Sequence, residues 1–221
     1  MYQNGRGVSQ DDAAAIGWYR KAADQGHVPA QVNLGLAYVN GQGVSQDYAT
    51  AASWFRKAAD QGFADSQNKL GVMYLNGRGV PQEYATAVTW FQKAADQGEA
   101  AAQSNLGLMY FNGYGVSQDY ATAASWFRKA ADQGFADAQN NLGLMYVNGQ
   151  GVSKDYATAV SWFQKAADQG EAAAQNNLGV MYLNGYGVSQ DEAAALSWFR
   201  KAADQGYARA QDNLRLMQGA L

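Results

Sequence analysis

The chain has 221 residues, of which 48% are hydrophobic, and its formal net charge is −3 at pH 7. This charge provides no basic field for nucleic acid or an anionic membrane, and no apolar run approaches the roughly 20 residues of a membrane-spanning helix. The absence of cysteine excludes disulfides and thiolate metal sites and leaves the redox compartment open.

The sequence is an array of one unit that recurs every 36 residues. Tryptophan marks the period, at Trp18, Trp54, Trp90, Trp126, Trp162 and Trp198. A Lys-Ala-Ala-Asp-Gln-Gly block follows each tryptophan at a fixed offset, and residues 45–116 recur nearly unchanged at 117–188. A period of this length is typical of solenoids, in which each unit buries its apolar face against its neighbours.

The chain begins with MYQNGRGV, which matches the end of a unit, as in MYLNGRGV at 73–80. We therefore expect residues 1–5 to be the tail of a helix whose body is missing, and residues 11–25 to form a helix without its partner. The uncovered apolar face of that helix, with Ile16 and Tyr19, predicts packing against another molecule. End-to-end self-association through this helix is the expected result.

Residues 45–62 show how the tryptophan-containing half of a unit forms a helix. Ser45 is the expected N-cap, Gly62 supplies the left-handed residue that ends the helix, and Ser189 with Glu192 has the spacing of a capping box. Apolar residues recur three and four apart, which predicts a buried stripe beside Trp54. The stripe contains Tyr48, Ala51, Ala52, Phe55, Ala58 and Ala59.

Residues 64–76 form the other predicted helix of the unit. One face carries Gln67, Leu70, Gly71 and Tyr74. Since Gly71 has no side chain, a neighbouring helix can approach closely there. Asn76-Gly77 ends the helix, and Gly77-x-Gly79 forms the turn into the next one.

These features resemble the Sel-1-like repeat family, a branch of the tetratricopeptide superfamily. The matching residues are Leu70-Gly71, Tyr74, Gly77, Gly79-Val80, Ala87, Trp90-Phe91, Lys93-Ala94-Ala95 and Gly98. The resemblance covers nearly every residue and implies an all-α, right-handed α-solenoid of about six stacked helix pairs that acts as a protein-binding scaffold. It also implies that the Leu-Gly helix comes first in each pair and lines the concave surface, with the tryptophan helix on the convex side.

The expected organisation is a single array over residues 1–221. It comprises a partial repeat at 1–26, full repeats at 27–62, 63–98, 99–134, 135–170 and 171–206, and a C-terminal capping helix at 207–221. In the last helix Arg215 replaces the close-packing glycine and Gln218 replaces the tyrosine. Both changes indicate an end cap.

No catalytic or metal-binding constellation is recognisable. His27 is the only histidine, and Phe63 or Glu99 takes its place in other units, which indicates a helix-end residue rather than a base or ligand. The acidic pairs Asp11-Asp12 and Asp191-Glu192 fall in first helical turns, where carboxylates offset the helix dipole. Nearly every polar residue recurs in several copies, whereas catalysis needs a unique convergence of unlike groups. We therefore predict a non-enzyme without metal or cofactor.

The Gly-x-Gly loops and the tryptophan row each resemble part of a ligand site, but the predicted fold explains both of them better. The Gly-x-Gly loops lack the third glycine and the preceding strand of a dinucleotide-binding fingerprint, so they indicate helix ends. The tryptophans, at helical spacing beside phenylalanine and alanine, predict a mostly buried row rather than a stacking ladder for sugars or bases.

One stripe of each first helix faces the concave groove by the resemblance, and it forms the candidate binding site. Its members are Asp65, Asn68, Val72, Leu75, Ser104, Leu108, Phe111, Asp137, Asn140, Leu144, Val147, Asn176, Val180 and Leu183. Exposed carboxamides at positions equivalent to Asn68 can pair with peptide groups of an extended ligand, and the aliphatic rows can hold its side chains. The rows of Val72 and Leu75 are equally consistent with burial between adjacent first helices.

The leading functional hypothesis is a non-catalytic scaffold that binds a protein or peptide segment in the groove. The alternative is a cell-envelope scaffold that binds polysaccharide or peptidoglycan, with the loop residues Tyr114 and Tyr186 as stacking partners. Neither hypothesis involves nucleic acid or membrane insertion. A signal peptide in the full gene would indicate a secreted or periplasmic protein.

Overall fold

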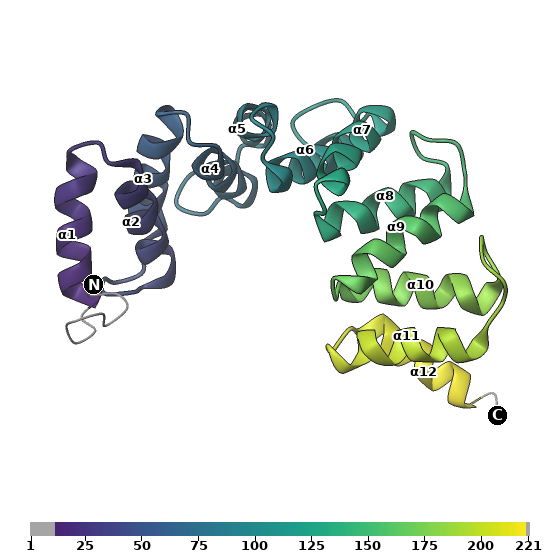
Figure 1. The fold of residues 1–221 in the computed structure, drawn as a ribbon. Helices are drawn as coiled ribbons and strands as arrows, with labels where there is room; N and C mark the ends of the chain where they lie inside the picture. The colour runs from purple at the N-terminus through teal and green to yellow at the C-terminus, as the bar shows by residue number, and fades with distance from the viewer. Residues whose placement is uncertain (1–11, 220–221) are drawn as a thin grey trace. The chain divides into compact units, whose positions relative to one another are not determined.

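A computed structural model describes residues 12–219, which form twelve α-helices and no β-strand (Figure 1). The helices are α1 Asp12–Asp24, α2 Val28–Asn40, α3 Tyr48–Asp60, α4 Ala64–Asn76, α5 Tyr84–Asp96, α6 Ala100–Asn112, α7 Tyr120–Asp132, α8 Ala136–Asn148, α9 Tyr156–Asp168, α10 Ala172–Asn184, α11 Glu192–Asp204 and α12 Ala208–Gly219. The predicted all-α fold of 36-residue helix pairs is confirmed. The helix tail expected at 1–5 lies outside the described residues.

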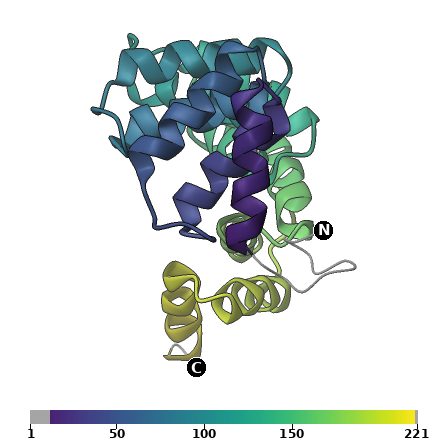
Figure 2. The ribbon, with the colours of Figure 1, turned by 90° about the vertical axis from the view of Figure 1, so that its left-hand side faces the viewer.

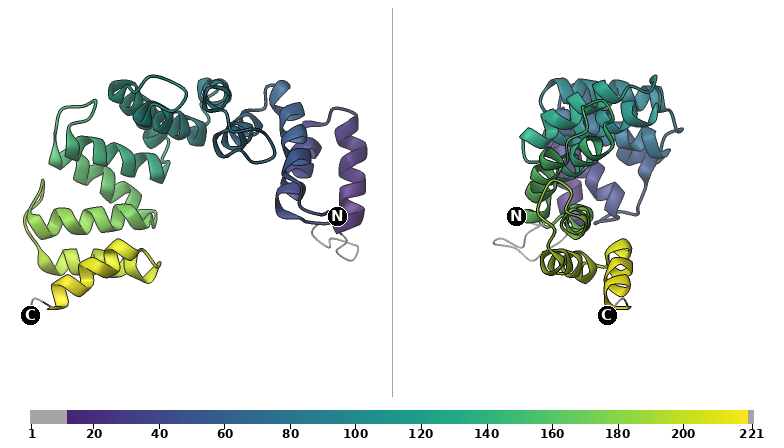
Figure 3. Two further views of the ribbon diagram at one scale, coloured as in Figure 1. Left: turned by 180° about the vertical axis from the view of Figure 1, so that it is seen from behind. Right: turned by 90° about the vertical axis from the view of Figure 1, so that its right-hand side faces the viewer.

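The described chain forms two compact units, divided within α6. The first unit holds residues 12–102 and 114–117, and the second holds 103–113 and 118–219. In the first unit α1, α2, α3 and α4 each pack against the next helix along the chain (Figure 2). Helices α7 to α11 do the same in the second unit (Figure 3). The core of each unit is therefore built from neighbouring repeats, as in other repeat proteins.

An acidic residue caps most of the tryptophan-containing helices. The Asp47 carboxylate accepts hydrogen bonds from the backbone N–H groups of Ala49 at 2.9 Å and Thr50 at 3.1 Å, and from the Thr50 hydroxyl at 2.6 Å. Asp119 and Asp155 make the same three bonds at the starts of α7 and α9. One carboxylate thus satisfies two N–H groups that the helix itself leaves unpaired.

This capping corrects the expected N-caps at Ser45 and Ser189. The helices begin two residues later, with Asp47 capping α3 and Asp191 capping α11. The chain stays extended through Asp47, and its N–H donates to the Tyr38 carbonyl oxygen at 2.9 Å. The preceding first helix therefore holds the loop until the aspartate is reached.

These caps predict a loss of stability in acid. A hydrogen bond from the Thr122 side chain, followed by one from its backbone N–H, lowers the pKa of Asp119, and equivalent bonds lower the pKa values of Asp47 and Asp155. A lowered folded-state pKa stabilises the fold above the ordinary aspartate value of about 3.9, and this contribution is lost as pH falls through the folded-state value. We expect the midpoint urea concentration of unfolding to decrease as the pH is lowered below about 4. This decrease should be less steep when all three aspartates are changed to asparagine, because asparagine still caps a helix and does not titrate. An equally steep fall in that variant would show that other groups dominate.

A phenylalanine from each tryptophan helix from α3 to α11 fills the space beside the glycine of the preceding first helix. The Phe163 side chain of α9 is 1% exposed, and a Cβ added to Gly143 of α8 would lie 2.6 Å from its ring. The same arrangement recurs at Gly35 with Phe55, Gly71 with Phe91, Gly107 with Phe127 and Gly179 with Phe199. The close approach expected at the glycine is confirmed, and an aromatic ring makes it.

In α4, α8 and α10, a buried glutamine links the first helix to the tryptophan helices on both sides. The Gln139 side-chain Nε2 donates to the Ala131 carbonyl oxygen at 3.0 Å, and its Oε1 accepts from Gln169 Nε2 at 2.8 Å. Equivalent pairs are formed by Gln67 with Gln97, Gln103 with Gln133 and Gln175 with Gln205. These buried amides are satisfied, as native cores require.

Ser66 in α4 departs from this pattern. Its side chain is fully buried, and its hydroxyl has no hydrogen-bond partner among the described residues. Ala138 takes the equivalent position in α8. We expect Ser66→Ala to raise the free energy of unfolding by about 1–3 kcal/mol, because it removes an unsatisfied buried group. Urea denaturation measures the change, and the reverse substitution Ala138→Ser should lower stability by a similar amount.

The tryptophan prediction holds for Trp54, Trp90, Trp126, Trp162 and Trp198, which are buried or half-buried, and fails for Trp18. Trp54 packs in a cluster with residues of α1 and α2. Within residues 12–219 no earlier helix pair lies beside α1, so the Trp18 side chain is 59% exposed.

The expected open face of α1 is corrected in the same way. Ile16 is 7% exposed and belongs to the core cluster of α1 and α2, and Tyr19 packs against that cluster. Trp18 is therefore the large apolar side chain that α1 presents to solvent. The predicted self-association through this helix remains a prediction, with Trp18 as the contact it would need.

Candidate functional site

The candidate residues of the first unit lie on α4. Asp65, Asn68, Val72 and Leu75 are all half-buried. The Asp65 carboxylate is already paired, because it lies 2.6 Å from the Lys69 ammonium one helical turn later. This face of α4 therefore offers little free charge to a ligand.

In the second unit the first helices carry a partly open aliphatic strip, which we define as Leu108 of α6, Leu144 of α8 and Val180 of α10. Leu108 is 38% exposed and Leu144 36% exposed, and Val180 is half-buried. Val180 also packs against a core cluster, and residues of the next candidate row are packed as well. Val147 and Leu183 pack against core clusters, and Phe111 meets the Tyr120 ring edge-on at 5.2 Å.

The carboxamide row of the second unit is not exposed, contrary to the sequence-based expectation. Asn140 is 8% exposed and Asn176 is 4% exposed. Asn177 Nδ2 donates to Asn140 Oδ1 at 2.8 Å, and Asn213 Nδ2 donates to Asn176 Oδ1 at 2.9 Å. We call these two bonds the asparagine ladder. It joins α8 to α10 and α10 to α12, so each of these amides binds the first helix of the following repeat.

The ladder predicts that replacing its asparagines with alanine lowers the free energy of unfolding, whereas replacing an exposed asparagine should change it little. Asn140→Ala removes the acceptor of the Asn177 amide in a buried position, so we expect the free energy of unfolding to fall by about 1–3 kcal/mol. Asn148→Ala changes an exposed asparagine of the same helix and should alter stability by less than about 0.5 kcal/mol. Urea denaturation of both variants provides the comparison. Equal effects would contradict a structural role for the ladder.

A pocket of about 240 Å³ lies between α6 and α8 in the second unit. It is lined by Ser104, Asn105, Leu108, Phe135, Asp137, Asn140, Asn141 and Glu171. Four of these were predicted as binding residues, whereas Asn105, Phe135, Asn141 and Glu171 were not. The available signal was the single serine in a row that otherwise carries asparagine on α4, α8 and α10.

Two carboxylates lie at this pocket. Asp137 stands exposed in the first turn of α8 and has no ion pair among the described residues. The Glu171 carboxylate caps α10 by accepting hydrogen bonds from the backbone N–H groups of Ala173, at 3.1 Å, and Ala174. None of the residues that line the pocket is basic. The pocket therefore favours a cationic ligand group over an anionic one.

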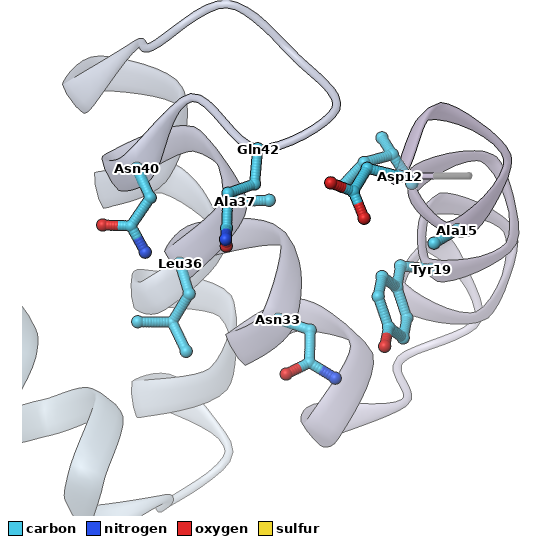
Figure 4. A pocket seen from close by; sticks show the side chains of 9 residues that line it. Asp12, Ala15, Tyr19, Asn33, Leu36, Ala37, Asn40 and Gln42 are labelled. Atoms are coloured by element: carbon cyan, nitrogen blue, oxygen red, sulfur yellow. The ribbon is translucent and has the colours of Figure 1, made fainter. Parts of the chain in front are cut away.

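A smaller pocket, of about 110 Å³, lies between α1, α2 and the loop that follows α2 (Figure 4). Side chains from the two helices face one another across it, among them Asp12 and Tyr19 of α1 and Asn33 of α2. Leu36, which is equivalent to Leu108, also lines it. None of the predicted binding residues lines this pocket.

The part of the chain from 12 to 219 contains no group of three His, Asp or Glu side chains placed to hold a metal ion. His27 caps α2, where its Nδ1 accepts from the Ala30 N–H at 3.2 Å, so its predicted helix-end role is confirmed. In the same part, every helix is too short or too polar to cross a membrane.

A model of the Sel1 repeat matches the chain at residues 1–27, 28–63, 64–99, 100–135, 136–171 and 172–207. No match is found among curated proteins. Among solved structures, the chain is 42% identical to a protective antigen of uropathogenic Escherichia coli strains with an SLR fold, with a TM-score of 0.91. It is 38% identical to a Sel1 repeat protein from Oxalobacter formigenes, with a TM-score of 0.86.

These similarities cover nearly all of the present chain and only part of each relative. The match covers 99% of this chain and 47% of the Escherichia coli antigen, and 98% of this chain and 63% of the Oxalobacter protein. A sel1 repeat protein from Klebsiella pneumoniae, 24% identical with a TM-score of 0.59, shares the fold over 92% of this chain.

Proposed function

Since the chain belongs to the Sel1 repeat family, we propose that it is a scaffold without catalytic activity that binds a protein or peptide segment on its first helices. Sel1 repeat proteins are usually protein-interaction scaffolds. The observation that carries the proposal is the aliphatic strip of the second unit, where Leu108 and Leu144 remain more than a third exposed on consecutive first helices. Exposed leucines in register on a repeat array suit the side chains of an extended partner.

The burial of Asn140 and Asn176 changes which residues would contact a ligand. These two asparagines hold α8, α10 and α12 together and so fix the positions of the first helices. The residues that would contact the ligand directly are the aliphatic strip and Asp137. Apolar contact would supply most of the affinity, at about 25 cal/mol for each Å² of apolar surface buried.

A peptide-display selection on the full chain tests this proposal. Enriched peptides should bind wild-type protein, and Leu144→Asp should raise their Kd about tenfold or more, since it places a charge in the contact. Ser125→Asp introduces the same charge at an exposed position of α7 and should leave the Kd unchanged. The urea midpoint of Leu144→Asp should stay near that of wild type because the leucine is already partly exposed. A selection that enriches no peptide, or peptides indifferent to Leu144, argues against this surface.

The glycan-binding alternative depends on the loop tyrosines. Tyr114 stacks on Tyr84 at a centroid distance of 5.0 Å, and Tyr186 stacks on Tyr156 at 4.9 Å. One face of each loop ring is thus occupied within the chain, which favours a role in holding the loop. Binding on a glycan array that is lost in Tyr186→Ala and retained in Leu144→Asp would support the alternative instead.

A further inference from the structure

The asparagine ladder lacks one rung, and we propose that the resulting pocket between α6 and α8 binds a basic side chain, Lys or Arg, of a peptide partner. The inference rests on the proposed function and names the chemistry of the partner. It involves only residues of the second unit. Ser104, Asn141 and Asp137 carry it.

The missing rung follows from one residue. In the two rungs present, an asparagine of one first helix donates to an asparagine of the preceding first helix. The next rung would join Asn141 of α8 to position 104 of α6, where the residue is serine. A serine Oγ is bonded directly to Cβ, whereas an asparagine Oδ1 lies one bond further out. The hydroxyl falls short, and the pocket of about 240 Å³ lies at this place.

The gap leaves polar groups without partners. Ser104 is 3% exposed and lines the pocket, and no hydrogen bond joins its hydroxyl to any described residue. Asn140 also lines the pocket, and the described chain provides an interaction for its Oδ1 but no acceptor for its Nδ2. Among the described residues, the buried side-chain atom without a partner is Ser66 Oγ, so the Ser104 Oγ and the Asn140 Nδ2 reach solvent in the pocket. A ligand that enters the pocket can replace this solvent and form hydrogen bonds with both groups.

The charge of the pocket selects the ligand group. In α4 the chain neutralises Asp65 with its own Lys69, at 2.6 Å. In α8 the equivalent carboxylate is Asp137 and the equivalent of the lysine is Asn141, so the cation is missing. A guanidinium or ammonium group would supply it and would donate to the Asp137 carboxylate and the Ser104 Oγ. Leu108 and Phe135 provide apolar walls for the aliphatic stem.

The size of the pocket agrees with a single side chain. Its volume of about 240 Å³ is below the range of about 300–1,000 Å³ that is typical of sites for whole small molecules. The rest of the partner would lie outside the pocket, over the neighbouring aliphatic strip at Leu108 and Leu144.

Titration with single capped amino acids tests the pocket apart from the scaffold function. The probes are N-acetyl-arginine amide, N-acetyl-lysine amide and the neutral N-acetyl-norleucine amide, added to the full ¹⁵N-labelled chain. We expect the two basic probes to shift the side-chain amide signals of Asn141 and Asn140, and the neutral probe to shift them little. The absence of any shift with the basic probes would overturn the pocket, whatever the peptide selection gives.

Two substitutions test separately whether the probe needs the negative charge of Asp137 and the empty space beside Ser104. Asp137→Asn keeps the shape and removes the charge, and should raise the Kd of the arginine probe about tenfold. Ser104→Asn supplies the missing acceptor for Asn141, so it should fill the pocket, abolish probe binding and raise the urea midpoint. Asp132→Asn removes an exposed carboxylate of α7 in the same unit, outside the pocket, and should leave probe binding unchanged. Binding that survives Ser104→Asn would place the ligand elsewhere and overturn the proposal.

The peptides selected for the proposed function give an independent outcome. Enriched peptides that share a Lys or Arg and bind Asp137→Asn about tenfold more weakly support the pocket. Peptides that need Leu144, contain no common basic residue and bind Asp137→Asn normally would retain the scaffold function and refute the pocket.

Discussion

We expect Gly151→Ala to lower the free energy of unfolding by roughly 2–5 kcal/mol, whereas Gly170→Ala should lower it by only about 1–2 kcal/mol. Both glycines have a left-handed backbone, with φ of +69° at Gly151 and +92° at Gly170. An added side chain is strained at both positions for that reason alone. The difference between them lies in what surrounds the added Cβ.

At Gly151 the Cβ would overlap the carbonyl group of Tyr120, at the start of α7. That group belongs to the backbone and cannot turn aside as a side-chain tip can, so the loop after α8 must move away from α7. At Gly170 no atom lies within 4 Å of the Cβ. Urea denaturation of the two variants therefore separates backbone strain from steric overlap. Similar losses would mean that the loop after α8 shifts at little cost.

The sequence predicted features that depend on spacing within one helix. The buried stripe of Ala51, Phe55 and Ala58 is confirmed because helical periodicity alone determines which side chains share a face. The close approach at Gly71 is confirmed for a related reason, since a glycine inside a helix is a poor helix former and usually indicates a packing role.

Features that depend on a neighbouring repeat were predicted less well. Asp47 rather than Ser45 caps α3, and the Tyr38 carbonyl, nine residues earlier, holds the chain extended up to it. Trp18 and Trp54 occupy the same place in the unit, yet only Trp54 has an earlier helix pair to cover it among the described residues.

In the candidate site, too, positions within one helix could be predicted from the sequence, and contacts between repeats could not. A helical wheel places Asn140 on the face opposite the core, and a single repeat gives no sign that Asn177 reaches it from the next first helix. The pocket at Ser104 could be recognised only once the ladder was known, because its signal is a departure from a pattern of contacts. Whether Leu108 and Leu144 contact a partner stays a prediction.

The largest single effect is expected at the aromatic ring beside the first-helix glycine. Phe163→Ala should lower the free energy of unfolding by about 3–5 kcal/mol, because the ring is almost fully buried and its loss leaves a cavity. Gly143→Ala alone should also destabilise, since its Cβ would lie 2.6 Å from that ring. Overpacking costs about 1–3 kcal/mol, and the gain in helix propensity of about 1 kcal/mol offsets only part of it.

The two substitutions should be strongly coupled, and the sign of the second should depend on the first. Once Phe163 is alanine, the space beside Gly143 is open, so Gly143→Ala should stabilise the protein by up to about 1 kcal/mol through helix propensity and partial filling of the cavity. Gly17→Ala in α1 is the matched control, because its Cβ would meet no atom within 4 Å, and it should stabilise in both backgrounds. Urea denaturation of the four members of the cycle measures the coupling. If Gly143→Ala cost as much without the ring as with it, the ring would not be the reason for glycine at this position, and the close approach of α8 and α9 would have to depend on their backbones.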